Sequence, residues 1–179
     1  MMKIASLVGR ELKWSQPKAR KKEFELHAGD ELAATLRFES ILGSLATAES
    51  GDGCWTFKRV GFFRTHLSIR HCDDDTHDIA VFRNKTWESG GTLEMAGGST
   101  FLASTNFWDT KLTFSTESKE PLVVFKTDGM IHLSAEVEIM PKAATLPELP
   151  LMMILGWYLA IAMMNDAMGG AAAAAAGAA

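Results

Sequence analysis

Cysteine is scarce in this chain, and a long leader-like apolar segment is missing from its first residues. Its 179 residues include two cysteines, Cys54 and Cys72, which are too few for a disulfide framework. They suit a reducing compartment, although one bridge between them remains open. Only five residues, 4–8, lie between the first lysine and the interruption by Gly9 and Arg10, and this stretch is too short for the core of a signal peptide. We therefore expect a cytoplasmic protein.

The familiar motifs of catalysis and nucleotide binding are also missing. The sequence contains no G-x-S-x-G elbow for a nucleophile, no phosphate-binding loop and no dinucleotide fingerprint. The net charge of -4 and the pI of about 5.7 argue against a surface built as a nucleic-acid footprint. We expect a protein that is not an enzyme, needs no cofactor and does not bind nucleic acid, and whose protein partners the sequence does not identify.

Most of the chain has the alternating pattern of β-strands. Apolar and polar residues alternate in 23–27 and 32–38, which form a hairpin around Ala28-Gly29-Asp30, and again in 64–70, 111–115 and 132–139. Glycine and aspartate pairs recur between these segments and mark turns. The spacing predicts eleven or twelve short strands between about Glu11 and Ile139, arranged as an antiparallel meander in a sandwich or a barrel.

A continuous apolar run, residues 151–164, follows the strands. A helix that is apolar on every face must be surrounded by apolar material, which is either a bilayer or a protein shell. We expect a helix at about residues 148–167, starting with a capping box at Thr145 and Glu148 or with Pro150 as its first residue, and stopping at Gly169-Gly170. Residues 1–167 then form a single domain, and residues 168–179 are a Gly/Ala-rich low-complexity tail.

The length of the run favours burial in protein. Fourteen residues span about 21 Å, whereas the hydrocarbon core of a bilayer is about 30 Å thick. A sheet of about twelve strands closes around more space than its own side chains can fill, and a central helix would fill it. The fold expected is mainly β, an antiparallel barrel of about 12 strands enclosing a hydrophobic C-terminal helix. The alternative is a tail-anchored membrane protein that inserts this helix.

A β-meander that ends in a wholly hydrophobic helix resembles the tubby C-terminal-like superfamily, which includes tubby proteins, phospholipid scramblases and plant LURP-one-related proteins. The similarity covers about Glu11 to Ala167 and lies chiefly in residues 151–164 and the hairpins before them. It implies a barrel threaded by the helix, and the engagement of phosphoinositides or other membrane lipids by a non-enzymatic module or interaction scaffold. A scramblase-like protein is the membrane-inserted version of this resemblance.

The densest basic segment is residues 10–22, with six basic residues against one acidic. Five of its cations are the candidate contacts for anionic lipid, at about 1 kcal/mol per cation near a membrane surface: Lys13, Lys18, Arg20, Lys21 and Lys22. Such a protein would sit peripherally at a membrane. The alternative is a solvated loop between two early strands.

Residues 71–78 collect two imidazoles, a thiol and four carboxylates, all of them possible metal ligands. The candidate ligands are His71, Asp73, Asp75 and His77. The segment lacks the glycine and the bidentate glutamate of an EF-hand loop, and no second cysteine pair supports zinc. We expect a polar hairpin tip without a metal, and keep a metal-dependent enzyme as the alternative.

Overall fold

Twelve antiparallel strands form a closed barrel around one helix in the computed structural model of this chain. The structure describes residues 1–18, 21–40, 43–61, 65–84, 90–106, 110–128 and 133–176, the last eleven without their side chains. The strands are β1 (Leu12–Ser15), β2 (Glu23–Ala28), β3 (Glu31–Phe38), β4 (Ala46–Ser50), β5 (Gly53–Val60), β6 (His66–His71), β7 (Ala80–Asn84), β8 (Gly90–Met95), β9 (Thr100–Thr105), β10 (Lys111–Ser115), β11 (Pro121–Asp128) and β12 (Ser134–Ile139).

Each strand pairs with the next one in the sequence, and β1 pairs with β12 to close the barrel. In that closing pair, Leu12 lies opposite Val137 and Trp14 opposite Ala135. Closure leaves no free sheet edge at which another chain could add a strand. The antiparallel barrel of about twelve strands predicted from the sequence is confirmed.

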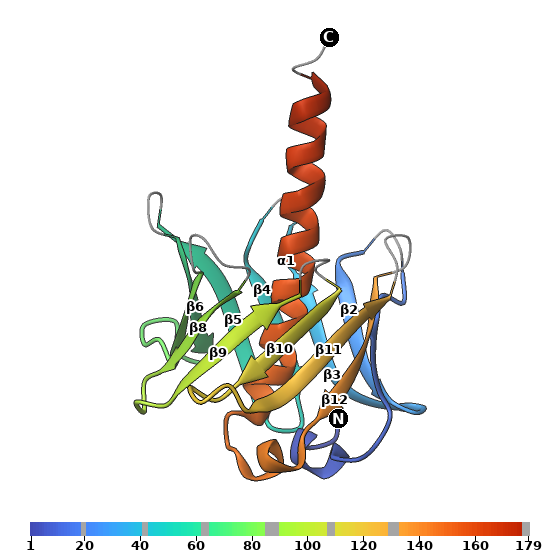
Figure 1. Ribbon diagram of the computed structural model, residues 1–179, viewed down its shortest axis with the longest axis vertical. Helices are drawn as coiled ribbons and strands as arrows, with labels where there is room; N and C mark the ends of the chain where they lie inside the picture. The colour runs from blue at the N-terminus through green and yellow to red at the C-terminus, as the bar shows by residue number, and fades with distance from the viewer. Residues whose placement is uncertain are drawn as a thin grey trace.

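Helix α1 (Leu149–Ala176) runs through the barrel and continues beyond it (Figure 1). Two short 3-10 helices, η1 (Ile4–Leu7) and η2 (Pro141–Thr145), lie where α1 begins and contact it. We call this end the base and the opposite end, where α1 leaves, the mouth. Because successive strands alternate in direction, the β1–β2, β3–β4, β5–β6, β7–β8, β9–β10 and β11–β12 connections lie at the mouth, and the other five lie at the base.

The helix fills the interior because both surfaces are apolar. Residues 151–161 of α1 are all buried, and the strands direct alternate side chains toward them. Trp157 stacks on Trp14 with ring centroids 6.0 Å apart, and Tyr158 stacks on Phe38 at 5.3 Å. The Tyr158 hydroxyl also donates a hydrogen bond to the Ser44 carbonyl oxygen at 2.7 Å. The predicted buried central helix is confirmed.

The helix ends differ from the sequence prediction. No capping box forms, because Thr145 belongs to η2 and α1 begins at Leu149, one residue before Pro150. Nor does Gly169-Gly170 stop the helix, which continues to Ala176, because alanine has the highest helix propensity and residues 171–176 are all alanine. In the described part of the chain, no helix combines the length and hydropathy needed to cross a bilayer.

Candidate functional site at the barrel mouth

Basic residues are concentrated at the mouth. We count the described residues in the mouth connections and the two strand residues on each side of them. Seven are basic and three are acidic: Lys18, Lys21, Lys22, Arg37, Arg59, Arg83 and Lys111 against Glu23, Glu39 and Asp128. This excess of cations stands out in a chain whose net charge is -4.

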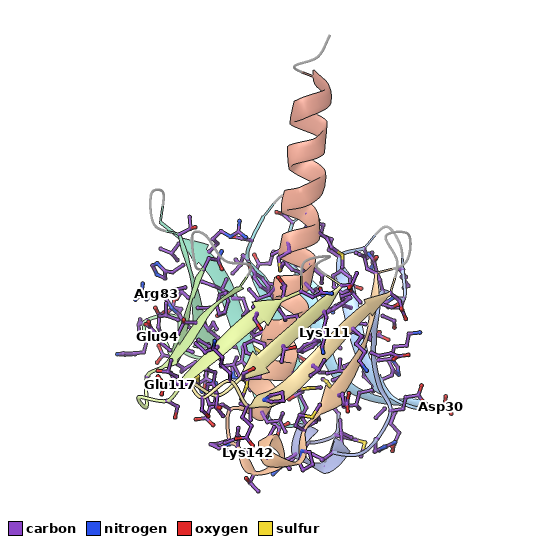
Figure 2. The ribbon with its side chains drawn as sticks, viewed as in Figure 1. Asp30, Arg83, Glu94, Lys111, Glu117 and Lys142 are labelled. Atoms are coloured by element: carbon purple, nitrogen blue, oxygen red, sulfur yellow. A yellow bond between two sulfur atoms is a disulfide. The ribbon has the colours of Figure 1, made fainter. Side chains whose placement is uncertain are left out.

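The base has the opposite balance. Counted in the same way, with the N-terminal segment before β1 and the segment between β12 and α1 included, the described residues of the base comprise six basic residues, Lys3, Arg10, Lys13, Arg70, Lys119 and Lys142, and fourteen acidic residues, Glu11, Asp30, Glu31, Glu49, Asp52, Asp73, Asp74, Asp75, Asp78, Glu94, Glu117, Glu120, Glu138 and Glu148. Figure 2 shows Asp30, Glu117 and Lys142 toward the base, and Arg83 and Lys111 nearer the mouth. The described part of the barrel is therefore electrically polar along the axis of α1, and a charged surface would orient it mouth-first or base-first.

Three mouth lysines are available for contacts outside the chain. Lys18, Lys21 and Lys111 are exposed, and none has an ion-pair partner among the described residues. Two of the mouth arginines are paired instead: Arg37 Nε lies 3.3 Å from Glu23, and Arg83 Nε lies 3.0 Å from Glu94, which is counted with the base but reaches Arg83 across the short β7–β8 pair. These exposed pairs contribute little to stability.

The predicted lipid-contact residues separate into two groups. Lys18, Lys21 and Lys22 lie together in the β1–β2 connection at the mouth, where the Lys22 ammonium also sits 5.8 Å from the centre of the Phe38 ring. Lys13 is on β1 near the base and faces outward, with its neighbours Leu12 and Trp14 buried. Arg20 lies outside the described residues. The prediction that this segment connects two early strands is confirmed.

The predicted metal ligands His71, Asp73, Asp75 and His77 lie in or beside the β6–β7 connection at the base. Asp74 organises this connection by accepting hydrogen bonds from Thr76 and His77, and these bonds hold the pKa of Asp74 well below its usual range. The described residues contain no group of three or more His, Cys, Asp or Glu side chains placed to hold a metal ion. The prediction that this polar segment connects two neighbouring strands is confirmed.

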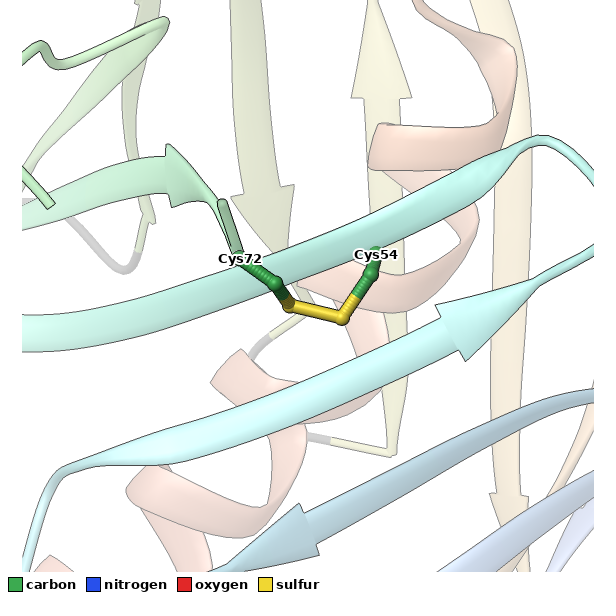
Figure 3. The surroundings of a disulfide bond; sticks show 2 residues. All are labelled: Cys54 and Cys72. Carbon is green, nitrogen blue, oxygen red and sulfur yellow. A yellow bond between two sulfur atoms is a disulfide. The ribbon is translucent and has the colours of Figure 1, made fainter. Parts of the chain in front are cut away.

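A disulfide joins Cys54, on β5, to Cys72, just after β6 (Figure 3). The Cys72 amide also donates to the Cys54 carbonyl oxygen at 3.2 Å, so the two residues are neighbours across the β5–β6 hairpin. The single bridge that the sequence left open is therefore formed, and it does not fit the reducing compartment that the scarcity of cysteine suggested. Disulfides persist mainly in oxidising environments, so the cysteines no longer support the expected cytoplasmic location.

Asp78 ties the C-terminal part of the β6–β7 connection to β6. Its carboxylate accepts hydrogen bonds from the Ser68 hydroxyl and from Arg70 Nε, the latter at 2.6 Å. Partial burial raises the pKa of Asp78, but the bonds from Ser68 and Arg70 and the Arg70 charge outweigh it and leave the pKa lowered. These contacts explain why the hydroxyl-bearing Ser68 is almost completely buried.

The seven basic residues at the mouth come from five different connections, whereas the sequence analysis identified only the basic segment of residues 10–22. Arg37, Arg59, Arg83 and Lys111 come from the ends of four strands, far apart in the chain. An up-and-down meander places every second turn at the same end, so tallying charge over alternate turns would have found the polarity. Comparison with protein-family models, with curated proteins and with solved structures gives no match for this chain.

Proposed function

We propose that this chain is a non-enzymatic, tubby-like barrel module that docks its mouth on an anionic membrane surface. One observation carries the proposal: among the described residues, cations outnumber acidic residues at the mouth, while acidic residues dominate the base. An anionic bilayer attracts the first end and repels the second, so both ends favour the same orientation.

The position of α1 supports the same orientation. The helix leaves the barrel at the mouth, so its continuation points toward whatever the mouth faces (Figure 1). Val60, one of two large exposed apolar side chains among the described residues, is at the mouth end of β5 and is 37% exposed. A mouth-first approach would bring cations and apolar surface to the headgroup layer together.

Attraction to the headgroups does not require α1 to leave the barrel. Its first half fills the core through contacts such as the Trp14–Trp157 stack, and withdrawing it would expose the inner faces of all twelve strands. Peripheral docking keeps these contacts, whereas the tail-anchored alternative gives them up. We therefore place peripheral docking before insertion.

Vesicle co-sedimentation tests the proposal with a matched pair of variants. The mouth variant changes Lys18, Lys21 and Lys111 to glutamine, and the base variant changes Lys3, Lys13 and Lys119 to glutamine. Each removes three exposed lysines and leaves the same net charge. At about 1 kcal/mol per cation, the mouth variant should bind phosphatidylserine vesicles about a hundredfold more weakly.

The base variant should bind at least as well as wild type. Wild-type binding should also fall steeply between 50 mM and 500 mM salt, because exposed charges are screened over about 8 Å at physiological ionic strength. Equal losses in the two variants, or no pelleting of wild type with anionic vesicles, would refute docking through the mouth.

A further inference from the structure

The N-terminal segment covers the base of the barrel. We call residues 2–7, which include η1, the base cover. Its side chains Ile4 and Leu7 are completely buried, and η1 contacts α1. Lifting the base cover would therefore expose these two side chains and the apolar start of α1, where Leu149 is also completely buried.

The β4–β5 turn holds the base cover in place. The Gly51 amide donates a hydrogen bond to the Met2 carbonyl oxygen at 3.1 Å, and the Ile4 amide donates to Asp52 Oδ2 at 2.7 Å. The contact leaves no room for a side chain at position 51, because a Cβ atom there would lie 2.5 Å from the Met2 carbonyl oxygen. The position of the base cover thus depends on the position of this turn.

The Cys54–Cys72 disulfide begins two residues after Asp52 (Figure 3). Cys54 is the second residue of β5, and Cys72 directly follows β6. The bridge therefore fastens the start of β5, and with it the β4–β5 turn, to the end of β6. Strand ends open more readily than strand centres, so loss of the bridge should loosen the turn before it affects the rest of the barrel.

The bridge is accessible to thiols from solvent. Cys72 is exposed and Cys54 is half-buried. Cys54 precedes the buried Trp55, so its side chain lies on the outer face of the barrel. Thiol exchange requires a thiolate to reach a disulfide sulfur, and exposed disulfides are the labile ones. In a reducing compartment, such a bridge forms transiently and serves redox sensing.

We propose that the Cys54–Cys72 pair is a reversible redox latch for the base cover. The reductant is a small thiol such as glutathione, whose thiolate attacks Sγ of Cys72, forms a mixed disulfide and releases the Cys54 thiolate. A second glutathione thiolate attacks the glutathione sulfur and releases the Cys72 thiolate. Two glutathione molecules are thus oxidised to one glutathione disulfide, and the two cysteine thiolates take up the two protons that they gave up. The latch lies at the base and does not depend on docking through the mouth.

The rate of reduction by glutathione, measured by thiol labelling of the full-length chain, tests whether the folded protein is attacked. We expect this rate to stay within about twofold as urea is raised to just below the unfolding transition, because attack on the exposed bridge needs no unfolding. If reduction required global unfolding, the rate would rise about fivefold or more for each molar of urea. Such a rise would overturn the latch.

Amide hydrogen exchange of the oxidised and reduced chain, measured by NMR, tests what the latch holds. Exchange at Ile4 and Gly51 should become at least about fivefold faster on reduction, the factor that corresponds to one ordinary hydrogen bond. The control is η2, the other 3-10 helix at the base, where the amides of Ala143 and Leu146 also donate backbone hydrogen bonds. Their exchange should change less than about twofold. Equal acceleration in η2, or no acceleration at Ile4 and Gly51, would contradict the proposal.

Three variants connect the bridge to the base cover. With Cys54 and Cys72 both changed to alanine, exchange at Ile4 should match that of the reduced wild type and ignore reductant. In Asp52→Ala the Ile4 amide has lost its acceptor, so it should exchange at the same rate in both redox states. Asp52→Asn keeps an acceptor oxygen and should keep the response. A redox response at Ile4 that survives Asp52→Ala would refute the β4–β5 turn as the connection.

Discussion

Replacing Gly156 with alanine adds one methyl group where α1 passes the inner face of β11. A Cβ atom at this position would lie 2.2 Å from Phe125 Cε2, 2.3 Å from Cζ and 3.0 Å from Cδ2. Normal contacts between carbon atoms are about 3.5–4.0 Å, so the ring or the helix would have to move by more than 1 Å. Phe125 is completely buried, and its ring has no solvent-facing side into which it could move.

Two effects of opposite sign decide the result. Alanine is favoured over glycine inside a helix by about 1 kcal/mol. Overpacking a well-filled core costs about 1–3 kcal/mol, and the short distances to a buried ring place this site near the upper limit. We therefore expect Gly156→Ala to lower the free energy of unfolding by about 1–2 kcal/mol. For a chain of this length, the melting temperature should fall by about 2–8 °C.

Urea unfolding of four proteins separates the clash from the helix propensity: wild type, Gly156→Ala, Phe125→Leu and the double variant. In the Phe125→Leu background the added methyl group has room, so the same glycine change should cost at least about 1 kcal/mol less. A Gly156→Ala protein more stable than wild type would refute the close packing of α1 on β11, as would equal effects in the two backgrounds.

Two further changes test the β6–β7 connection. Replacing Cys54 and Cys72 with alanine removes a bridge across 18 positions and should lower the free energy of unfolding by up to about 3 kcal/mol. A reductant should lower the melting temperature of the wild-type protein and leave that of the variant unchanged. A wild-type melting temperature that does not respond to reductant would contradict the bridge. Because the pKa of Asp78 is lowered in the folded protein, its contribution is present above the unfolded pKa of about 3.9 and is lost as pH falls through the folded value. The stability gap between wild type and Asp78→Asn should therefore shrink from pH 7 to pH 3, and a constant gap would rule out this ionisation.

The barrel could be predicted because its signal is local. Strand alternation in segments such as β2, β3 and β12 shows one face buried and the other solvated, and a helix apolar on every side needs an enclosing shell. The strand pattern alone is compatible with a sandwich or a barrel, because closure depends on pairing the first strand with the last, and it was the apolar helix that favoured the barrel. That pairing joins Leu12 to Val137 across most of the chain.

The mouth and the disulfide were harder to predict for the same reason. Cys54 and Cys72 come together only because β5 and β6 pair in a register that places Trp55 opposite His71. The inward position of Arg59 likewise depends on a strand that continues to Val60, although the buried alternation ends at Phe57. Composition identifies these residues as reactive or charged, but only the register determines their neighbours.

The threaded helix constrains the order in which this chain can fold. The strands that need α1 as their core are all made before it, and β1 must wait for β12 before the sheet can close. During synthesis, the inner faces of the early hairpins therefore remain without their final packing partner. Pairings so distant in sequence are slow to form, and partly assembled sheets with apolar faces are prone to aggregate. The finished barrel has no free sheet edge, but its folding intermediates have both free edges and exposed apolar faces. These intermediates are therefore the species that would benefit most from a chaperone.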